Sequence, residues 1–133
     1  MTTTYFLNSI MGNVFGSKTS PALPTRYYVG LSKTAPNING TGVTEPSSSA
    51  GYARIALDML SEPVDGAITN NDSVTFDESI SAWGTVTHFV IYDAETGGNL
   101  LMYDALTTPR AVEEATVVII KKGSLNLTLA NPA

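Results

Sequence analysis

The chain offers very few side chains that could carry out catalysis or hold a metal ion. His88 is its only histidine, and cysteine is absent. A general base or a metal ligand needs partners close by, so a site at His88 would have to draw carboxylates from elsewhere in the chain. The pattern around it places His88 within a strand, on one face with Val86, Val90 and Tyr92, and we interpret it as a structural residue. The lack of cysteine excludes disulfides and cysteine-ligated metals and is compatible with assembly in a reducing cytoplasm.

One group of acidic residues could bind a hard cation. Asp72, Asp77 and Glu78 lie close together in the sequence, but their spacing does not match an EF-hand loop. A solvated turn at the end of a strand explains them better. No serine lies in the Gly-x-Ser-x-Gly turn of hydrolases, and no glycine-rich loop leads into the Lys-Ser/Thr pair that cradles phosphates. The sequence therefore predicts a protein that is not an enzyme and that uses no cofactor or metal.

Charge narrows the choice of partner. The 133 residues include 7 Lys and Arg against 12 Asp and Glu, which gives a formal net charge of −5. The one run of basic residues is Lys121-Lys122, so the chain lacks the clusters that neutralise nucleic-acid phosphates. Anionic membrane surfaces repel an acidic protein, and no stretch approaches the ~20 apolar residues of a transmembrane helix. We expect neither nucleic acid nor a membrane as partner.

The surface is predicted to be poor in charge. Charged residues make up 14% of the chain, against ~25% in typical domains, and Thr, Ser, Asn and Gly take their place. Such a surface gives up its water easily. Either other subunits cover much of it, or it forms a neutral polar coat.

The first element is predicted to be an amphipathic helix over about residues 4–15. Thr3 or Thr4 can cap its start, and Gly16 is suited to end it. Its apolar half comprises Phe6, Leu7, Ile10, Met11, Val14 and Phe15. This half packs either on the protein's own sheet or on a neighbouring subunit. The short connection that follows, with Pro21 and Pro24, favours packing within the chain.

After the connection at 18–25 the period changes to two residues, which indicates strands. Alternating or β-branched segments lie at residues 26–32, 52–58, 74–76, 83–92, 99–103, 116–120 and 124–129. Residues 61–72 are rich in turn formers. Six to eight short strands with one N-terminal helix predict a mainly β protein, an antiparallel β-sandwich of jelly-roll-like type. The length predicts one domain over residues 1–133.

The clearest strand signal is the block from Trp83 to Tyr103, in which two apolar runs flank Gly97-Gly98. These glycines supply the positive φ that a tight β-hairpin turn needs. Both faces of Val86–Ile91 are apolar, so this strand is either central in the sandwich or covered by another chain. Trp83 itself is a core residue or an interface anchor.

Residues 33–51 are long for a loop in a compact domain and rich in Gly, Pro, Ser, Thr and Asn. Long loops of this kind are usually functional or disordered. Such a composition buries too little apolar surface to offset the ordering entropy. We therefore expect this segment to be mobile in the free protein and to become ordered by contact in an assembly.

Four motifs carry a resemblance to a known family. They are Tyr28-Val29-Gly30-Leu31-Ser32, Glu45-Pro46 followed by Gly51-Tyr52-Ala53-Arg54, Trp83-Gly84-Thr85-Val86-Thr87-His88, and Gly97-Gly98-Asn99-Leu100-Leu101. Together they resemble the small structural proteins of tailed bacteriophages, a family labelled both tail-fibre and capsid-decoration protein. The resemblance implies a non-enzymatic, oligomeric component of the virion, assembled in the cytoplasm of the host bacterium.

Three functions fit these observations. The favoured one is a capsid decoration or cement protein on the surface of the virion that clamps the major capsid protein, because the chain lacks the repeats of a fibre shaft. The alternative is a structural subunit associated with the tail, collar or fibre. The third is a carbohydrate-binding β-sandwich that uses Tyr27, Tyr28 and Tyr103. For self-association we expect a homotrimer, because closed cyclic symmetry suits both capsid three-fold positions and fibre axes.

The residues that we predict to contact a partner come from the helix, the long loop and the strand motifs. They are Phe6, Ile10, Val14, Asn37, Asn39, Glu45, Tyr52, Arg54, Trp83 and His88.

Overall fold

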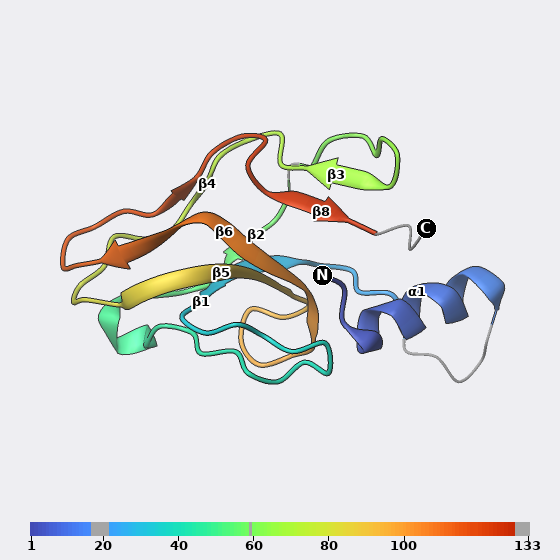
Figure 1. Ribbon diagram of the computed structural model, residues 1–133, viewed down its shortest axis with the longest axis horizontal. Helices are drawn as coiled ribbons and strands as arrows, with labels where there is room; N and C mark the ends of the chain where they lie inside the picture. Colours follow the sequence, from blue (N-terminus) through green and yellow to red (C-terminus); the bar gives the residue numbers. More distant parts are fainter. Residues whose placement is uncertain (17–21, 59, 130–133) are drawn as a thin grey trace.

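A four-stranded antiparallel sheet forms the centre of the fold (Figure 1). The computed structural model describes residues 1–16, 22–58 and 60–129. In the sheet the strands follow the order β2 (Ile55–Ala56), β1 (Tyr28–Ser32), β5 (Gly84–Tyr92) and β6 (Leu100–Val112). β5 lies between β1 and β6. Of the two alternatives for the strand with two apolar faces, a central place in the sheet is therefore the one observed.

Two short ribbons form the layer opposite this sheet. β3 (Ala67–Thr69) pairs with β8 (Asn126–Thr128), and β4 (Val74–Thr75) pairs with β7 (Ile119–Ile120), all antiparallel. The main core lies between the layers and includes Val29, Leu31, Phe76, Trp83, Val86, Leu101, Val112, Ile120 and Leu125. The predicted mainly β, antiparallel sandwich with one N-terminal helix is confirmed.

One strand lies where the sequence indicated only turns. β3 occupies part of the segment at 61–72, because its neighbour Asn70 is buried and ties the segment to the C-terminal ribbon. The Asn70 side-chain amide donates to the carbonyl of Lys121 at 3.0 Å, and its oxygen accepts from the Leu125 amide at 3.0 Å. These contacts join residues more than fifty positions apart, which a local pattern cannot reveal.

The predicted hairpin is confirmed as β5 and β6, with Gly97 and Gly98 at positive φ in the turn. The register is interrupted between Val86 and His88. For this reason the expectation that His88 shares a face with Val86 is wrong. Val86 packs in the main core with Phe89. Val90 and Tyr92, which lie two and four positions after His88, belong to the cluster on the other face of the sheet.

The second face of the sheet is covered by the chain's own long loop. Val43, from the segment 33–51, packs against a small cluster formed by Val90, Tyr92, Leu100 and Tyr103. The loop is hydrogen-bonded to itself: the Lys33 amide donates to the Thr44 carbonyl at 2.8 Å, and the Asn37 amide donates to the Thr41 carbonyl at 2.8 Å. Its mobility in the free protein stays a prediction, and these contacts oppose it.

α1 (Thr4–Phe15) has the predicted bounds and caps. The Thr3 hydroxyl accepts from the Phe6 amide at 3.3 Å, and Gly16 ends the helix at φ 76°. The Thr3 amide donates to the Leu101 carbonyl at 2.9 Å, which fixes the start of the helix against β6. In Figure 1 the helix extends from this point beyond the end of the sheet. Among the described residues no helix has the length and apolar character needed to cross a membrane.

The helix is rotated relative to the expectation that its apolar half packs on its own sheet. Ser9 is the residue that is fully buried, whereas Phe6 and Ile10 are half-buried. The centre of the apolar half is exposed, with relative exposures of 44% for Leu7, 55% for Met11, 66% for Val14 and 76% for Phe15. Packing within the chain therefore accounts for only one edge of this half. The connection that favoured it lies partly outside the described residues, which omit 17–21.

Candidate functional site

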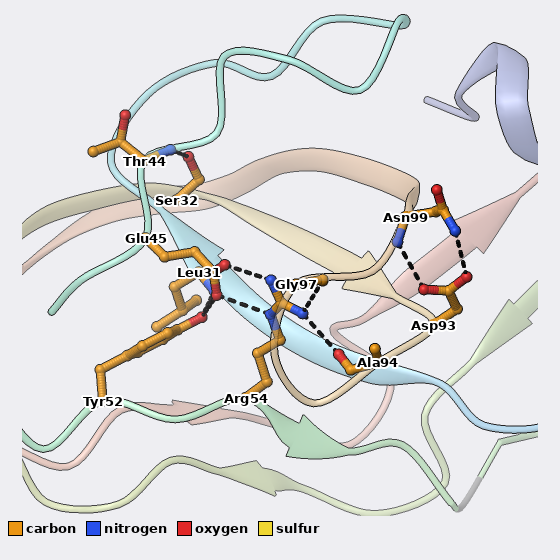
Figure 2. A network of polar contacts seen from close by, with 10 residues as sticks. All are labelled: Leu31, Ser32, Thr44, Glu45, Tyr52, Arg54, Asp93, Ala94, Gly97 and Asn99. Carbon is orange, nitrogen blue, oxygen red and sulfur yellow. Dashed lines mark hydrogen bonds and ion pairs between the residues drawn. The ribbon is translucent and has the colours of Figure 1, made fainter. Parts of the chain in front are cut away.

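Three of the predicted site residues form one polar cluster, which we name the Arg54 clasp: Glu45, Tyr52 and Arg54 (Figure 2). The Arg54 guanidinium donates to both carboxylate oxygens of Glu45, from Nη2 to Oε1 at 2.7 Å and from Nε to Oε2 at 3.0 Å. The Tyr52 hydroxyl donates to Oε2 of the same carboxylate at 2.5 Å and accepts from the Leu31 amide at 3.0 Å. A two-pronged guanidinium–carboxylate pair of this kind is both strong and geometrically specific.

Arg54 also holds the turn of the β5–β6 hairpin. Its Nη1 donates to the carbonyls of Ala94 at 2.7 Å and Gly97 at 2.8 Å. The guanidinium lies over the Tyr92 ring, 3.6 Å from its centroid, in a cation–π contact. One side chain thus joins the long loop, the strand region after it and a turn 40 residues further along the chain.

Burial decides the protonation of the clasp. It raises the pKa of Tyr52 well above its usual value, and the hydrogen bond to the Glu45 carboxylate adds to this effect. Burial also raises the pKa of Tyr92, again with a contribution from the Glu45 charge. Both phenols therefore stay protonated near neutral pH, and neither can act as a general base. The clasp has the properties of a structural device.

A glycine makes room for this cluster. A Cβ atom built on Gly30 would lie 2.5 Å from the Tyr52 hydroxyl oxygen and 3.1 Å from Oε2 of Glu45. No side chain fits at that distance. Gly30 lies in β1 directly beneath the clasp, so the Tyr28–Ser32 motif and the Glu45–Arg54 motif depend on each other sterically.

The hairpin turn has its own polar contacts next to the clasp. The carboxylate of Asp93 accepts from the Asn99 backbone amide at 2.7 Å and from the Asn99 side-chain amide at 3.0 Å. Gly98 lies close beneath them, since a Cβ there would lie 2.5 Å from Oδ1 of Asp93. The turn is therefore shaped by fixed hydrogen bonds on both of its sides.

The other predicted contact residues lie apart from the clasp. Trp83 is a core residue, 3% exposed, and its indole donates to the Ala50 carbonyl at 2.9 Å. It lies edge-on to Tyr52, with ring centroids 5.4 Å apart. Burial removes both aromatic rings from contact with a partner, so the core alternative describes Trp83. His88 is half-buried in β5, with Nδ1 2.8 Å from the Thr87 hydroxyl oxygen.

Asn37 and Asn39 are exposed at the tip of the long loop. Both side chains bond to the hydroxyl of Thr41, at 3.2 Å and 2.6 Å. They shape the tip and leave it on the surface.

An apolar surface lies on another part of the molecule. The exposed side chains of Leu7, Met11, Val14 and Phe15 form what we name the apolar face of α1. Beside the helix a groove of about 410 Å³ is lined by Phe6, Tyr27, Leu57, Leu60, Pro63, Gly66, Ile68, Ile91, Met102, Leu127 and Leu129. Phe6 belongs to α1 and lines this groove, so the two apolar surfaces adjoin. Of the described residues that line the groove, none is charged.

Sequence reasoning found the residues of α1 but missed the groove. Its lining comes from both layers and from the helix, and no local pattern joins these segments. The three tyrosines of the carbohydrate-binding alternative do not form a shared exposed platform. Tyr27 lines the groove, Tyr28 is half-buried in β1, and Tyr103 is buried under the long loop.

Metal chemistry finds no support in the side chains that the structure describes. Over residues 1–16, 22–58 and 60–129, no group of three or more His, Asp or Glu side chains is arranged to hold an ion. Asp72, Asp77 and Glu78 are all exposed.

Comparison with known proteins decides the family. The family model described as podophage GP4 fiber I protein gp80 matches residues 1–128. The chain belongs to this family. The resemblance to phage structural proteins is therefore confirmed, and the protein is a structural component of a phage virion. A search of curated proteins finds no match to this chain.

Proposed function

We propose that the chain is a non-enzymatic subunit of the virion's fibre, held there by protein–protein contact through the apolar face of α1. Membership of a family of podophage fibre proteins supports a fibre location over the capsid surface that the sequence favoured. The absence of shaft-forming repeats, which favoured decoration, is equally compatible with a short adaptor or terminal subunit of a fibre.

The observation that carries this proposal is the exposed face of α1. Four large apolar side chains lie together on a helix that contains no charged residue. Contiguous exposed apolar patches on folded proteins mark interaction sites. An isolated helix of this length is only marginally stable in water, so a partner that covers this face would also stabilise the helix.

The state of the polar clasp supports a non-enzymatic role. Its carboxylate, guanidinium and phenol are all bound to one another or to backbone groups. A catalytic base has to be free to take a proton from a substrate. The clasp instead fixes the loop and turn at one end of the sandwich.

For the partners we propose other copies of this chain, in a homotrimer, together with a further virion protein. A contact between an apolar helix face and a groove on the next copy is heterologous, and such contacts form a ring of cyclic symmetry where the rotation between copies closes. The groove beside α1 adjoins the face of the helix, which suits a contact of this kind.

The proposal can be tested with phage that lack this protein and are supplied with variants during infection. We expect Met11→Lys/Val14→Lys to fold normally but to be absent from purified particles, because two charges would be buried at the contact. Ile80→Lys is the matched control, since Ile80 is an equally exposed apolar residue outside the helix and the groove (69% exposed).

Incorporation of the double variant at the wild-type level would contradict a role for α1. Quantitative mass spectrometry of the wild-type particle tests the location. A copy number close to that of the major capsid protein would contradict the fibre assignment and support capsid decoration. A copy number matching that of the other fibre proteins would support the fibre assignment.

A further inference from the structure

A second concave surface lies where β6 departs from regular pairing, and we name it the bulge pocket. It encloses about 230 Å³ between β6 and the segment that contains β7. Its lining comprises Phe89, Ala105, Leu106, Thr107, Thr108, Arg110, Val118, Ile119, Ile120, Lys121 and Ser124. It shares no lining residue with the apolar groove or the Arg54 clasp.

The pocket exists because of an irregularity in the hairpin. Val86 pairs with Arg110 and His88 pairs with Ala105, so the four residues 106–109 of β6 lie opposite Thr87 alone. Bulges of this kind bend a strand and redirect its side chains, and they are frequent beside binding sites. Pro109, which has no amide hydrogen to donate to a ladder, suits such a position. Three residues of the bulge, Leu106, Thr107 and Thr108, form one wall of the pocket, next to Ala105.

The pocket carries positive charge in an acidic protein. Arg110 and Lys121 line it, and no carboxylate does so. Neither side chain forms an ion pair with a carboxylate in the part of the chain that the structure describes; the ion pair found there is Arg54–Glu45. Both are exposed on a chain of net charge −5. Two free cations at the rim of a concave surface form an attractive site for an anion.

The remaining lining combines hydroxyls with an apolar wall. Thr107, Thr108 and Ser124 line the pocket, and each carries a hydroxyl that can donate and accept a hydrogen bond. Leu106 and Phe89 supply apolar surface. The volume lies below the ~300–1,000 Å³ of sites for drug-sized ligands, which suits a single small ring.

We propose that the bulge pocket binds an acidic sugar, with its carboxylate held by Arg110 and Lys121. The ring hydroxyls then exchange hydrogen bonds with the threonine and serine hydroxyls, and the C–H face of the ring lies toward Leu106. Inorganic phosphate would satisfy the cations and can accept from the hydroxyls, but it would leave the apolar wall unused. The ligand class therefore follows from the three features together.

The test is a titration of the isotope-labelled full chain with sodium glucuronate, followed by amide chemical shifts in NMR. We expect saturable shifts confined to residues 105–110 and 118–124, and a dissociation constant that rises with ionic strength, since exposed charges are screened. Glucose, which lacks the carboxylate, and inorganic phosphate, which lacks the ring, should each bind at least about tenfold more weakly.

Variants locate the contact. Arg110→Gln/Lys121→Gln should weaken glucuronate binding by at least about tenfold and leave the rest of the spectrum unchanged, which also shows that the variant is folded. Lys122→Gln is the control for a charge lost beside the pocket, because it removes one positive charge next to Lys121 and Lys122 does not line the pocket. The proposal is overturned by the absence of shifts at the pocket, by phosphate binding as tightly as glucuronate, or by an equal loss in the control.

Discussion

At the scale of single residues, the Arg54 clasp shows why a buried charge is retained in this protein. Burying an ion pair costs desolvation free energy, which only good geometry and further hydrogen bonds offset. Arg54 meets both conditions, with two bonds to Glu45, two to backbone carbonyls and the Tyr92 ring beneath it. The clasp thereby joins the long loop, the strand region after it and the hairpin turn.

Gly30 and Tyr52 should be energetically coupled. Gly30→Ala places a Cβ against the Tyr52 hydroxyl, and we expect it to lower the free energy of unfolding by about 1–3 kcal/mol. Tyr52→Phe leaves the Leu31 amide without its partner and should cost about 1–3 kcal/mol. The double variant should lose about 1 kcal/mol less than the two single losses combined, because the phenylalanine removes the clashing oxygen.

Urea unfolding of the four proteins measures this coupling. Gly123→Ala combined with Tyr52→Phe serves as the control cycle, because a Cβ on Gly123 meets no atom within 4 Å. That pair should be additive. Additivity in the Gly30 cycle as well would mean that β1 and the clasp adjust independently.

Tyr52 should also make stability depend on alkaline pH. Its pKa is raised in the folded state by burial and by Glu45, whereas in the unfolded chain it is about 10. The stabilisation is therefore complete below pH 10 and is lost as the pH rises, because only the unfolded state releases the proton. Between pH 9 and 11 the wild type should lose about 1 kcal/mol more than Tyr52→Phe.

Urea unfolding of both proteins across this pH range supplies the measurement. Tyr27 and Tyr92 have raised pKa values too, so the variant keeps part of the alkaline loss. A constant difference between the two proteins from pH 8 to 11 would show that Tyr52 ionises freely in the folded state.

Sequence reasoning selected the clasp residues as contact residues, and their contact with a partner stays a prediction. Glu45, Tyr52 and Arg54 stood out as polar and aromatic residues of a family motif, which is correct as far as it goes. Their partners lie on Leu31, Ala94 and Gly97, up to 43 residues away. Whether the residues of a motif face a partner or the protein's own interior depends on such distant contacts. A single sequence does not show which distant residues come together.

At the scale of elements, the long loop has a role that its composition conceals. Residues 33–51 were expected to be mobile because they are polar and rich in glycine. Val43 packs against the second face of the sheet, backbone hydrogen bonds join the two arms of the loop to each other, and the Thr4 amide donates to the Ile38 carbonyl at 2.9 Å. Composition averages over a segment, so it does not reveal the few residues, such as Val43 and the buried Ala50, that pack against the rest of the fold.

The clasp should control how often this loop opens. Glu45→Gln removes the ion pair to Arg54, so we expect trypsin to cleave after Lys33 several-fold faster in the isolated protein. Glu95→Gln is the control, because Glu95 is an exposed acidic residue of the hairpin turn without an ion pair among the described residues. Cleavage is measured by mass spectrometry of early fragments. Equal cleavage rates of the two variants would show that the clasp does not control the opening of the loop.

The hairpin shows the limit of pattern reading for strands. The positions of β5, β6 and the Gly97-Gly98 turn followed from the sequence, because alternation and positive φ are local properties. The bulge did not, since one strand alone does not reveal that four residues of β6 face one residue of β5. Val86 and Phe89, three positions apart in β5, both lie in the main core, so strict alternation through this irregularity misassigned Val86.

At the scale of the whole molecule, the surface divides into parts with different chemistry. The long loop runs along the central sheet, and α1 extends past the end of the sheet (Figure 1). The amphipathic helix was predictable to the residue from its period and caps. Its rotation was not, because the burial of Ser9 depends on contacts outside the helix.

Self-association of the purified protein follows from the exposed face of α1, and we expect a homotrimer that dissociates on dilution. Leu7, Met11, Val14 and Phe15 would leave water on association, and apolar burial stabilises by roughly 25 cal/mol per Å². Met11→Lys/Val14→Lys should sediment as a monomer. Since both side chains are exposed in the single chain, its free energy of unfolding extrapolated to dilute protein should change by no more than about 0.5 kcal/mol.

Ile80→Lys should keep the wild-type sedimentation coefficient. A wild-type protein that stays monomeric up to high concentration would assign the helix face to a different virion protein, whereas a variant that unfolds would show that α1 packs on its own sheet after all.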